Sequence, residues 1–366
     1  MFTFFIGLFF STSLLISDSS PVSVEVRPGK VYIATSESGQ HLNFDFLVRN
    51  TTDQKLVINR VELSVFDASG KLALRDFYDE YGRLSLELSK TPALAPKANG
   101  LIFNPFHTFP KDIPLDLLKF EFSFSNEDRD KNFTATIEVR PVLYVQKTSL
   151  ILPLKGRSLV WDGYDYNSHH RRVDYTQNFF DQIGQKTNFQ RYAIDFVIAN
   201  ESGQHYRGRQ RTNDDWYRNR PDEMTDYLSY DAPVYAAGAG KVVAVRDDGE
   251  DRKFDPSQLS TDERAFYGNY VVIDHLNGEF TLYGHIKKGM ALVKVGDSVK
   301  QGVQIASVGA AGSSLFPHLH FELRDGSGAR TVEGLPAYFS NYRLILGSRT
   351  RLVKRGSVNT GEILTR

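Results

Sequence analysis

The 366-residue chain carries 44 basic and 44 acidic side chains, so its formal net charge is zero. A chain without a net positive field is not drawn to nucleic acid or to an anionic membrane surface, and we expect no nucleic-acid partner. Cysteine is absent, which excludes disulfides, thiolate zinc ligands and cysteine nucleophiles. A transition-metal site would therefore use carboxylates and the nine histidines. At roughly 150 residues per domain, the length predicts about two domains.

The N-terminal segment differs from ordinary domain sequence. The run from Phe2 to Ile16 is apolar and uncharged. It is shorter than the roughly 20 residues of a membrane-spanning helix and fits the apolar part of a signal peptide. No Lys or Arg precedes it and no small-residue cleavage site is evident, so a short anchor or a buried strand is an open alternative. We predict a signal peptide or short N-terminal anchor over residues 1–20, membrane anchoring at most through this segment, and export to the periplasm, cell envelope or extracellular space.

Residues 21–154 have the period-two pattern of β-strands. Apolar and polar residues alternate over 120–124, and a second alternating run follows a polar turn at 133–139. These runs predict a hairpin with one apolar face, and further runs of this kind predict an immunoglobulin-like β-sandwich. His41 and His107 are isolated. We therefore expect no catalytic residues in this region, and we expect it to be dispensable for peptide-bond chemistry.

Three polar stretches, 155–190, 200–230 and 247–265, interrupt the second half of the chain. Long loops are usually functional or disordered. They either wall a cleft or are solvated surface loops, and the sequence leaves both interpretations open.

The second half also contains short β runs punctuated by glycine, which predict a compact β unit. In one of these runs His318, His320 and Glu322 fall on one face of a strand. Imidazoles two residues apart lie roughly 7 Å from each other at about 3.3 Å rise per residue. One could bind a metal while the other reaches a water or a substrate oxygen. His285, at the end of another run, and Asp195, after an apolar run, are further candidates for the same site.

Motifs spread over residues 191–323 occur in the order of a known family. They are Arg191-Tyr192-Ala193-Ile194-Asp195, Ala232-Pro233-Val234-Tyr235, Gly268-Asn269-Tyr270-Val271, Leu282-Tyr283-Gly284-His285, Val295-Gly296-Asp297 and Pro317-His318-Leu319-His320-Phe321. The string resembles the M23 family of zinc metallopeptidases, the lysostaphin/LytM type that acts as peptidoglycan endopeptidases. The resemblance implies an antiparallel β-sheet peptidase domain, which we assign to residues 155–335 with long loop insertions. Residues 336–366 are then a C-terminal extension of a mainly β chain.

The resemblance also implies roles for individual residues. Asp195 and His320 match zinc ligands. His285 and His318 match catalytic histidines that act on a zinc-activated water and on the developing oxyanion, and which of them does which is open. His275 matches a structural position. One Zn²⁺ per chain is expected.

The chain departs from the family pattern at one ligand. The family usually has His four residues before the Asp ligand, whereas this chain has Arg191, a side chain with no free lone pair for a metal. Some relatives carry the His earlier, and His169 and His170 resemble that variant. We predict that one of this pair is the missing ligand, with His170 slightly favoured and His205 as the next candidate.

These assignments predict a zinc-dependent metalloendopeptidase that hydrolyses peptide bonds, with peptidoglycan peptides or another peptide as substrate. The first alternative is a catalytically degenerate M23-like domain that binds peptidoglycan or regulates a wall hydrolase. The second is a structural or carbohydrate-binding β protein in which the histidine pair is incidental.

Overall fold

The computed structural model describes residues 21–82, 93–177, 180, 184–207, 223–260 and 262–366. The elements in these ranges are β-strands and three short 3₁₀ helices, η1 (Met224–Asp226), η2 (Pro256–Ser260) and η3 (Ala265–Tyr267). The chain is mainly β, as the sequence predicts. The predicted signal peptide or anchor at 1–20 lies outside the described residues. Within them, no helix has the length and apolarity needed to cross a membrane.

The N-terminal β region comprises three sheets. Their hydrogen-bonded orders are β1-β4-β8, β11-β10-β5-β6 with β7 on β5, and β12-β2-β3-β9. The strands are β1 (Val22–Arg27), β2 (Tyr32–Thr35), β3 (Gln40–Leu42), β4 (Asp45–Asn50), β5 (Leu56–Phe66), β6 (Leu72–Asp79), β7 (Ala93–Leu94), β8 (Asn99–Phe103), β9 (Thr108–Phe109), β10 (Leu117–Asn126), β11 (Asn132–Val139) and β12 (Val142–Leu143).

The predicted hairpin is confirmed as β10 and β11, which pair antiparallel with Phe120 opposite Ile137 and Phe124 opposite Phe133. The alternation places Phe120 and Phe124 in one core with Phe46 from β4, and all three are fully buried. Aromatic and β-branched side chains fill such a half-buried pleated surface well. The two sheets that contain β4 and β10 therefore share one hydrophobic core. The finer assignment to an immunoglobulin-like sandwich stays a prediction.

The C-terminal β region is built on one large sheet of order β19-β16-β17-β18-β21-β14-β13-β25-β23-β24, with β22 on β21 and a separate pair β15-β20. The strands are β13 (Arg157–Asp162), β14 (Ile194–Ile198), β15 (Pro233–Tyr235), β16 (Gly240–Arg246), β17 (Tyr270–Asp274), β18 (Phe280–Gly284), β19 (Ser298–Val299), β20 (Gln304–Ser307), β21 (Leu319–Arg324), β22 (Gly334–Leu335), β23 (Phe339–Leu346), β24 (Arg349–Gly356) and β25 (Ile363–Thr365).

The core of this region extends beyond residues 155–335. Leu150 and Leu154 are buried in it, and so are Phe339 and Leu364 near the C-terminus. Strand β25 pairs with both β13 and β23. Strands β23, β24 and β25, all within the predicted C-terminal extension of residues 336–366, are thus part of the main sheet.

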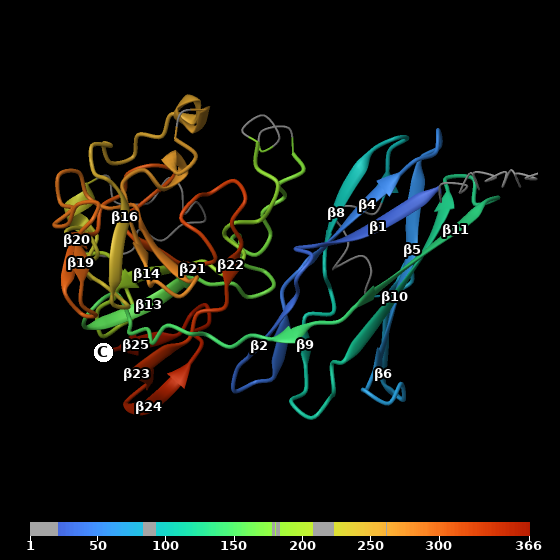
Figure 1. Cartoon of the computed structure of the whole chain (residues 1–366), viewed down its shortest axis with the longest axis horizontal. Helices are drawn as coiled ribbons and strands as arrows, with labels where there is room; N and C mark the ends of the chain where they lie inside the picture. The colour runs from blue at the N-terminus through green and yellow to red at the C-terminus, as the bar shows by residue number, and fades with distance from the viewer. Residues whose placement is uncertain (1–20, 83–92, 178–179, 181–183, 208–222, 261) are drawn as a thin grey trace, which may run out of the picture.

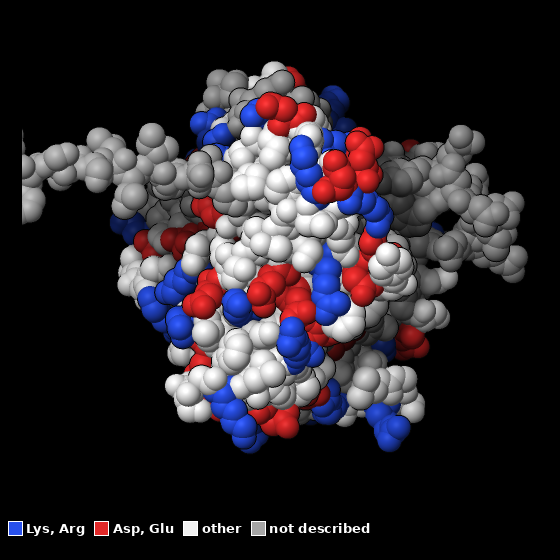
Figure 2. All heavy atoms as spheres, turned by 90° about the vertical axis from the view of Figure 1, so that its right-hand side faces the viewer, with Lys and Arg blue, Asp and Glu red and all other residues white. Residues whose placement is uncertain are grey.

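The two regions lie side by side along the long axis of the molecule, with β2 and β9 nearest the C-terminal β region (Figure 1). Contacts join them directly. The backbone N–H of Thr35 donates to the phenolic oxygen of Tyr338 at 2.8 Å, and Glu37 pairs with Arg351. On the face in Figure 2, basic and acidic side chains are interspersed, in keeping with the zero net charge of the chain.

Candidate active site

Four neighbouring strands of the large sheet bring the candidate residues into one row. Asp162 on β13 lies opposite Asp195 on β14, Asp195 lies opposite His320 on β21, and His320 lies opposite Gly284 on β18. His285 follows Gly284 directly. Residues opposite each other in antiparallel strands have Cβ atoms about 5 Å apart. The sheet register therefore assembles the site from segments that are up to 158 residues apart in the sequence, the separation of Asp162 from His320.

Asp195 is the centre of the site and is only 3% exposed. Its Oδ1 lies 3.0 Å from His320 Nδ1, and its Oδ2 lies 3.5 Å from His170 Nε2 and 3.4 Å from His318 Nε2. The donor atoms of His170, Asp195 and His320 all lie within 4.8 Å of one another, and all three residues are buried. Two imidazoles and one carboxylate are a ligand set that zinc accepts at catalytic sites.

The two histidines of this cluster are held from behind by further carboxylates. His320 Nε2 donates to Glu322 Oε1 at 2.8 Å, and Glu322 Oε1 also accepts from the Tyr267 hydroxyl. His170 Nδ1 lies 3.1 Å from Asp162 Oδ2, an ion-pair distance without hydrogen-bond geometry. A carboxylate behind a histidine fixes the ring and raises its basicity as a ligand. The arrangement leaves Nδ1 of His320 and Nε2 of His170 directed at Asp195.

His169 and His170 differ in position although they are neighbours in the sequence. The His169 side chain is 67% exposed and its Nδ1 lies 2.8 Å from Asp162 Oδ2, whereas that of His170 is 1% exposed. Of the two, His170 has a nitrogen beside Asp195. His169 instead pairs with Asp162, at the outer edge of the site.

His285 and His318 are oriented by backbone carbonyls. His285 Nδ1 donates to the carbonyl of Ala311 at 2.7 Å, and His318 Nδ1 donates to that of Phe316 at 2.8 Å. A carbonyl cannot donate, so each ring carries its proton on Nδ1 when neutral, and Nε2 is an acceptor. The two rings lie 4.7 Å apart. His285 also has a φ of 59°, which is uncommon for a residue with a side chain.

Burial and neighbouring charges determine which side chains of the site are protonated. Burial lowers the pKa of His318, and it holds the pKa of His285 well below the usual value, with the charges of His318 and His320 acting in the same direction. For His320 burial also opposes the charge, but hydrogen bonds to Asp195 and Glu322 prevail and raise its pKa to about 9. Burial opposes ionisation of Asp195, yet the surrounding histidines keep its pKa well below normal. The site thus holds an ionised carboxylate, a position that stabilises positive charge, and two neutral imidazoles.

The other histidines of this region lie outside the cluster. Both nitrogens of His275 have partners, the carbonyl of Ala239 and the hydroxyl of Thr281. His205 packs against the ring of Trp161 at 4.5 Å, and burial lowers its pKa to about 4.

Parts of the polar loops do line the site. Trp161, Tyr227 and Phe316 form a small buried or half-buried aromatic cluster with His205 and Tyr206. The ring of Phe316 in turn lies 5.0 Å from His318. The described ends of the stretch 200–230 therefore pack against Phe316, which contacts His318, while residues 208–222 lie outside the described ranges.

Arg191 occupies the position of the missing histidine but does not join the cluster. Its guanidinium is buried and lies 2.7 Å from Asp45 of β4 and 3.3 Å from Glu333. Asp174 stands four residues after His170, the same spacing that the family has between its histidine and aspartate ligands. It is not part of the cluster either, because its carboxylate accepts from the backbone N–H and the hydroxyl of Thr176 in a local turn.

Asp162 is a site residue that the sequence analysis missed. A signal was available, since Asp162 ends a short β run, Ser158 to Asp162, just ahead of the histidine pair. Glu322 was noted only for sharing a strand face with His318 and His320, and its role behind His320 was not foreseen.

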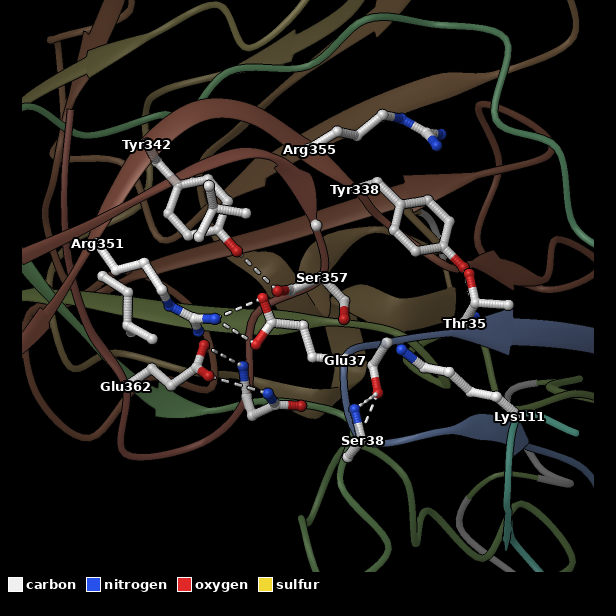
Figure 3. A pocket seen from close by; sticks show the side chains of 15 residues that line it. Thr35, Glu37, Ser38, Lys111, Tyr338, Tyr342, Arg351, Arg355, Ser357 and Glu362 are labelled. Carbon is white, nitrogen blue, oxygen red and sulfur yellow. Dashed lines mark hydrogen bonds and ion pairs between the residues drawn. The ribbon is translucent and has the colours of Figure 1, made fainter.

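A separate cavity lies between the two β regions, and its lining includes none of the clustered histidines or carboxylates. It is formed by the turn after β2 and by the β23–β24 hairpin, where Glu37 pairs with Arg351 and the Tyr342 hydroxyl donates to the carbonyl of Ser357 (Figure 3). Its contacts connect the two regions.

Comparison with known proteins gives a family match. Residues 226–332 match peptidase family M23, a range that includes His285, His318 and His320 but not Asp195. Peptidoglycan DD-endopeptidase ShyB of Vibrio cholerae serotype O1 is 39% identical over 104 residues, 28% of this chain and 20% of ShyB. Peptidoglycan DD-endopeptidase ShyC of the same organism is 34% identical over 166 residues, 44% of this chain and 33% of ShyC. The chain matches a third or less of the length of these curated relatives.

Among solved structures, a zinc containing peptidase from Vibrio cholerae aligns over 83% of each chain with 16% identity and a TM-score of 0.26, too low to support an inference about domain arrangement. The family match and the motifs around the histidine cluster lead to one conclusion: the C-terminal β region of this chain contains, over residues 226–332, a domain that matches peptidase family M23.

Proposed function

We propose that the protein is a zinc-dependent metalloendopeptidase that cleaves peptide bonds in peptidoglycan. The observation that carries the proposal is the buried cluster of His170, Asp195 and His320, whose donor atoms lie within 4.8 Å of one another. The match to M23 and the names of the relatives ShyB and ShyC support peptidoglycan peptides as the substrate class.

The donor set fits a zinc ion. Neutral imidazole and carboxylate are suitable ligands for it. Glu322 accepts a hydrogen bond from the far nitrogen of His320, and Asp162 lies 3.1 Å from the far nitrogen of His170. When bound, zinc polarises a carbonyl oxygen and makes water more acidic. We assign His170, Asp195 and His320 as its ligands.

The chain's own acid–base groups are His285 and His318. Each presents an unprotonated Nε2, because its Nδ1 proton is held by a backbone carbonyl. Such a nitrogen can take a proton from the attacking water and pass it to the leaving amine, and the protonated ring can donate to the developing oxyanion. The fixed rings and the buried setting require little reorganisation as charge develops.

The test combines metal content with wall hydrolysis. Purified protein supplied with zinc and dialysed is expected to retain about one equivalent, as a three-ligand site predicts. Incubation with purified peptidoglycan is expected to release new amino groups, whereas His318→Ala is expected to bind zinc and release none above background. Retained zinc with no amine release from the wild type would instead support the non-hydrolytic, peptidoglycan-binding alternative.

A further inference from the structure

The structure holds a fully buried charge cluster between the two β regions. Asp45, the first residue of β4, is 0% exposed and contacts two arginines of the C-terminal β region. Asp45 Oδ1 accepts from Arg171 Nη1 at 2.5 Å, and Asp45 Oδ2 accepts from Arg191 Nη1 at 2.7 Å. One carboxylate from the N-terminal β region thus faces two buried guanidinium groups.

Both arginines are placed next to metal-ligand candidates in the sequence. Arg171 directly follows His170, and Arg191 stands four residues before Asp195. Arg171 also donates to the carbonyl of Phe44 at 2.6 Å, so its position is fixed by two groups of the N-terminal β region.

The two segments that carry these arginines are also tied to each other. The side-chain amide of Asn188 donates to the carbonyls of His170 and Arg171 at 2.9 and 3.1 Å, and the backbone N–H of Arg191 donates to the Asn188 carbonyl. Asn43, beside Asp45, donates to the carbonyl of Arg191 at 2.8 Å. The backbone on either side of the cluster is therefore held from both β regions.

We propose that Asp45 is a positioning residue for the metal site, acting through Arg171 on His170 and through Arg191 on the segment that leads into Asp195. The proposal accounts for the residue at the missing-ligand position: Arg191 there anchors the segment to the N-terminal β region, while His170 supplies the nitrogen beside Asp195 from another loop. It revises the expectation that the N-terminal β region is dispensable for chemistry. It rests on the proposed zinc site.

The charges around Arg171 and Arg191 indicate that the positions of both side chains depend strongly on Asp45. Besides Asp45, Glu333 is the one carboxylate among the described residues that forms an ion pair with either arginine, at 3.3 Å from Arg191. Burial raises the pKa of Glu333 to about 7 against the charge of Arg191. Arg171 has no second carboxylate within ion-pair distance among the described residues. Removing the Asp45 charge leaves a buried guanidinium unpaired, and such groups are displaced or hydrated rather than left in place.

The test compares zinc affinity in full-length variants by competition with a chromogenic chelator. Asp45→Asn keeps the shape of the side chain and removes its charge. We expect its zinc affinity to fall by about tenfold or more, the loss that follows removal of outer-shell support. Asp45→Glu keeps the charge and is expected to recover part of the affinity.

The matched control is Glu279→Gln. Glu279 is also buried, and it accepts from Tyr144, Lys147 and Thr148 without contacting the metal-ligand segments. This variant is expected to unfold at a lower temperature while its zinc affinity in the folded state stays within about twofold of wild type. The control separates a general loss of stability from a specific effect on the site.

If Asp45→Asn does not fold, Arg171→Lys replaces it, because an ammonium cannot span Asp45 and the Phe44 carbonyl as the guanidinium does. A folded Asp45→Asn or Arg171→Lys with wild-type zinc affinity would overturn the proposal. Failure of the wild type itself to bind zinc would overturn the proposed function instead, so the two failures are distinguishable.

Discussion

Asp195 and His320 face each other across β14 and β21, with Asp195 Oδ1 3.0 Å from His320 Nδ1. The far nitrogen of His320 donates to Glu322. The ring therefore lies between two carboxylates, which is why its pKa is raised to about 9 despite burial. A site that stabilises a proton at this position is also suited to a divalent cation, because both are held by the same negative oxygen and imidazole nitrogen.

The first prediction concerns the identity of the ligand that replaces the family histidine. His170→Ala is expected to abolish tight zinc binding, because it removes the nitrogen 3.5 Å from Asp195. His169→Ala is expected to keep zinc, because that side chain is exposed and pairs with Asp162. Zinc content after dialysis, measured by atomic emission, checks both.

Aspartate variants provide the controls for this experiment. Asp195→Ala is expected to lose zinc and Asp174→Ala to keep it, since Asp174 is engaged in a local turn with Thr176. Full zinc retention in both histidine variants would contradict the assignment and leave His205 as the candidate to test next.

The second prediction separates ligands from acid–base groups. His285→Ala and His318→Ala are each expected to keep zinc and to lose roughly 10² to 10⁴ in turnover, the usual effect of removing a positioned acid or base. Their Nδ1 atoms are held by carbonyls, so neither ring is needed to build the cluster around Asp195. Loss of metal from a folded variant would mean that the role is misassigned.

The sequence predicted those parts of the site that are local in the chain. His318 and His320 lie two residues apart on one short segment, and Asp195 lies in a motif of its own, so family resemblance alone located them. His170 was harder to predict from the sequence, because it is 25 residues from Asp195 and reaches it only through a loop that folds back on β14. The pattern narrowed the choice to a pair, and the burial of His170 distinguishes the two.

The contacts of Asp45 could not be predicted in this way. Asp45 starts an alternating strand and looks like one polar residue on its outer face, yet it is fully buried against Arg171 and Arg191, 126 and 146 residues away. The neighbouring sequence does not distinguish a solvated aspartate from one that is buried between two regions of the protein. Leu150 and Leu364, which flank the predicted domain of residues 155–335, likewise enter the C-terminal core only through long-range packing.

The third prediction concerns the carboxylate behind His320. Glu322→Gln is expected to weaken zinc binding by about 10- to 100-fold, the range seen when an outer-shell partner of a metal-bound histidine is removed. Glu322 is 1% exposed, its Oε1 accepts from both His320 and Tyr267, and its Oε2 lies 3.4 Å from Arg324 Nη1. The amide therefore removes the negative charge behind His320 and places an NH₂ group beside a buried guanidinium. Chelator competition measures the loss, and Tyr267→Phe, which removes one donor but leaves the carboxylate, is expected to have the smaller effect. Equal zinc affinity of Glu322→Gln and wild type would count against a role for Glu322.

The last prediction is a pH dependence of stability that originates at Glu333. Burial raises the pKa of this carboxyl from 4.5 to about 7, against the opposing charge of Arg191. In the folded state Glu333 therefore holds its proton more tightly than in the unfolded state, and its stabilising contribution is complete below about pH 4.5 and is lost as the pH rises to about 7. The shift corresponds to about 3 kcal/mol at most.

Glu333→Gln keeps the protonated shape without titrating, so its thermal midpoint is expected to fall less than that of wild type between about pH 5 and pH 7. Glu80→Gln is the control, because Glu80 pairs with Arg129 on the N-terminal β region at an exposed site, and this variant is expected to keep the wild-type slope. Parallel pH profiles for wild type and Glu333→Gln would show that Glu333 is ionised throughout this range, and the charge balance around Arg191 would then include a second full negative charge.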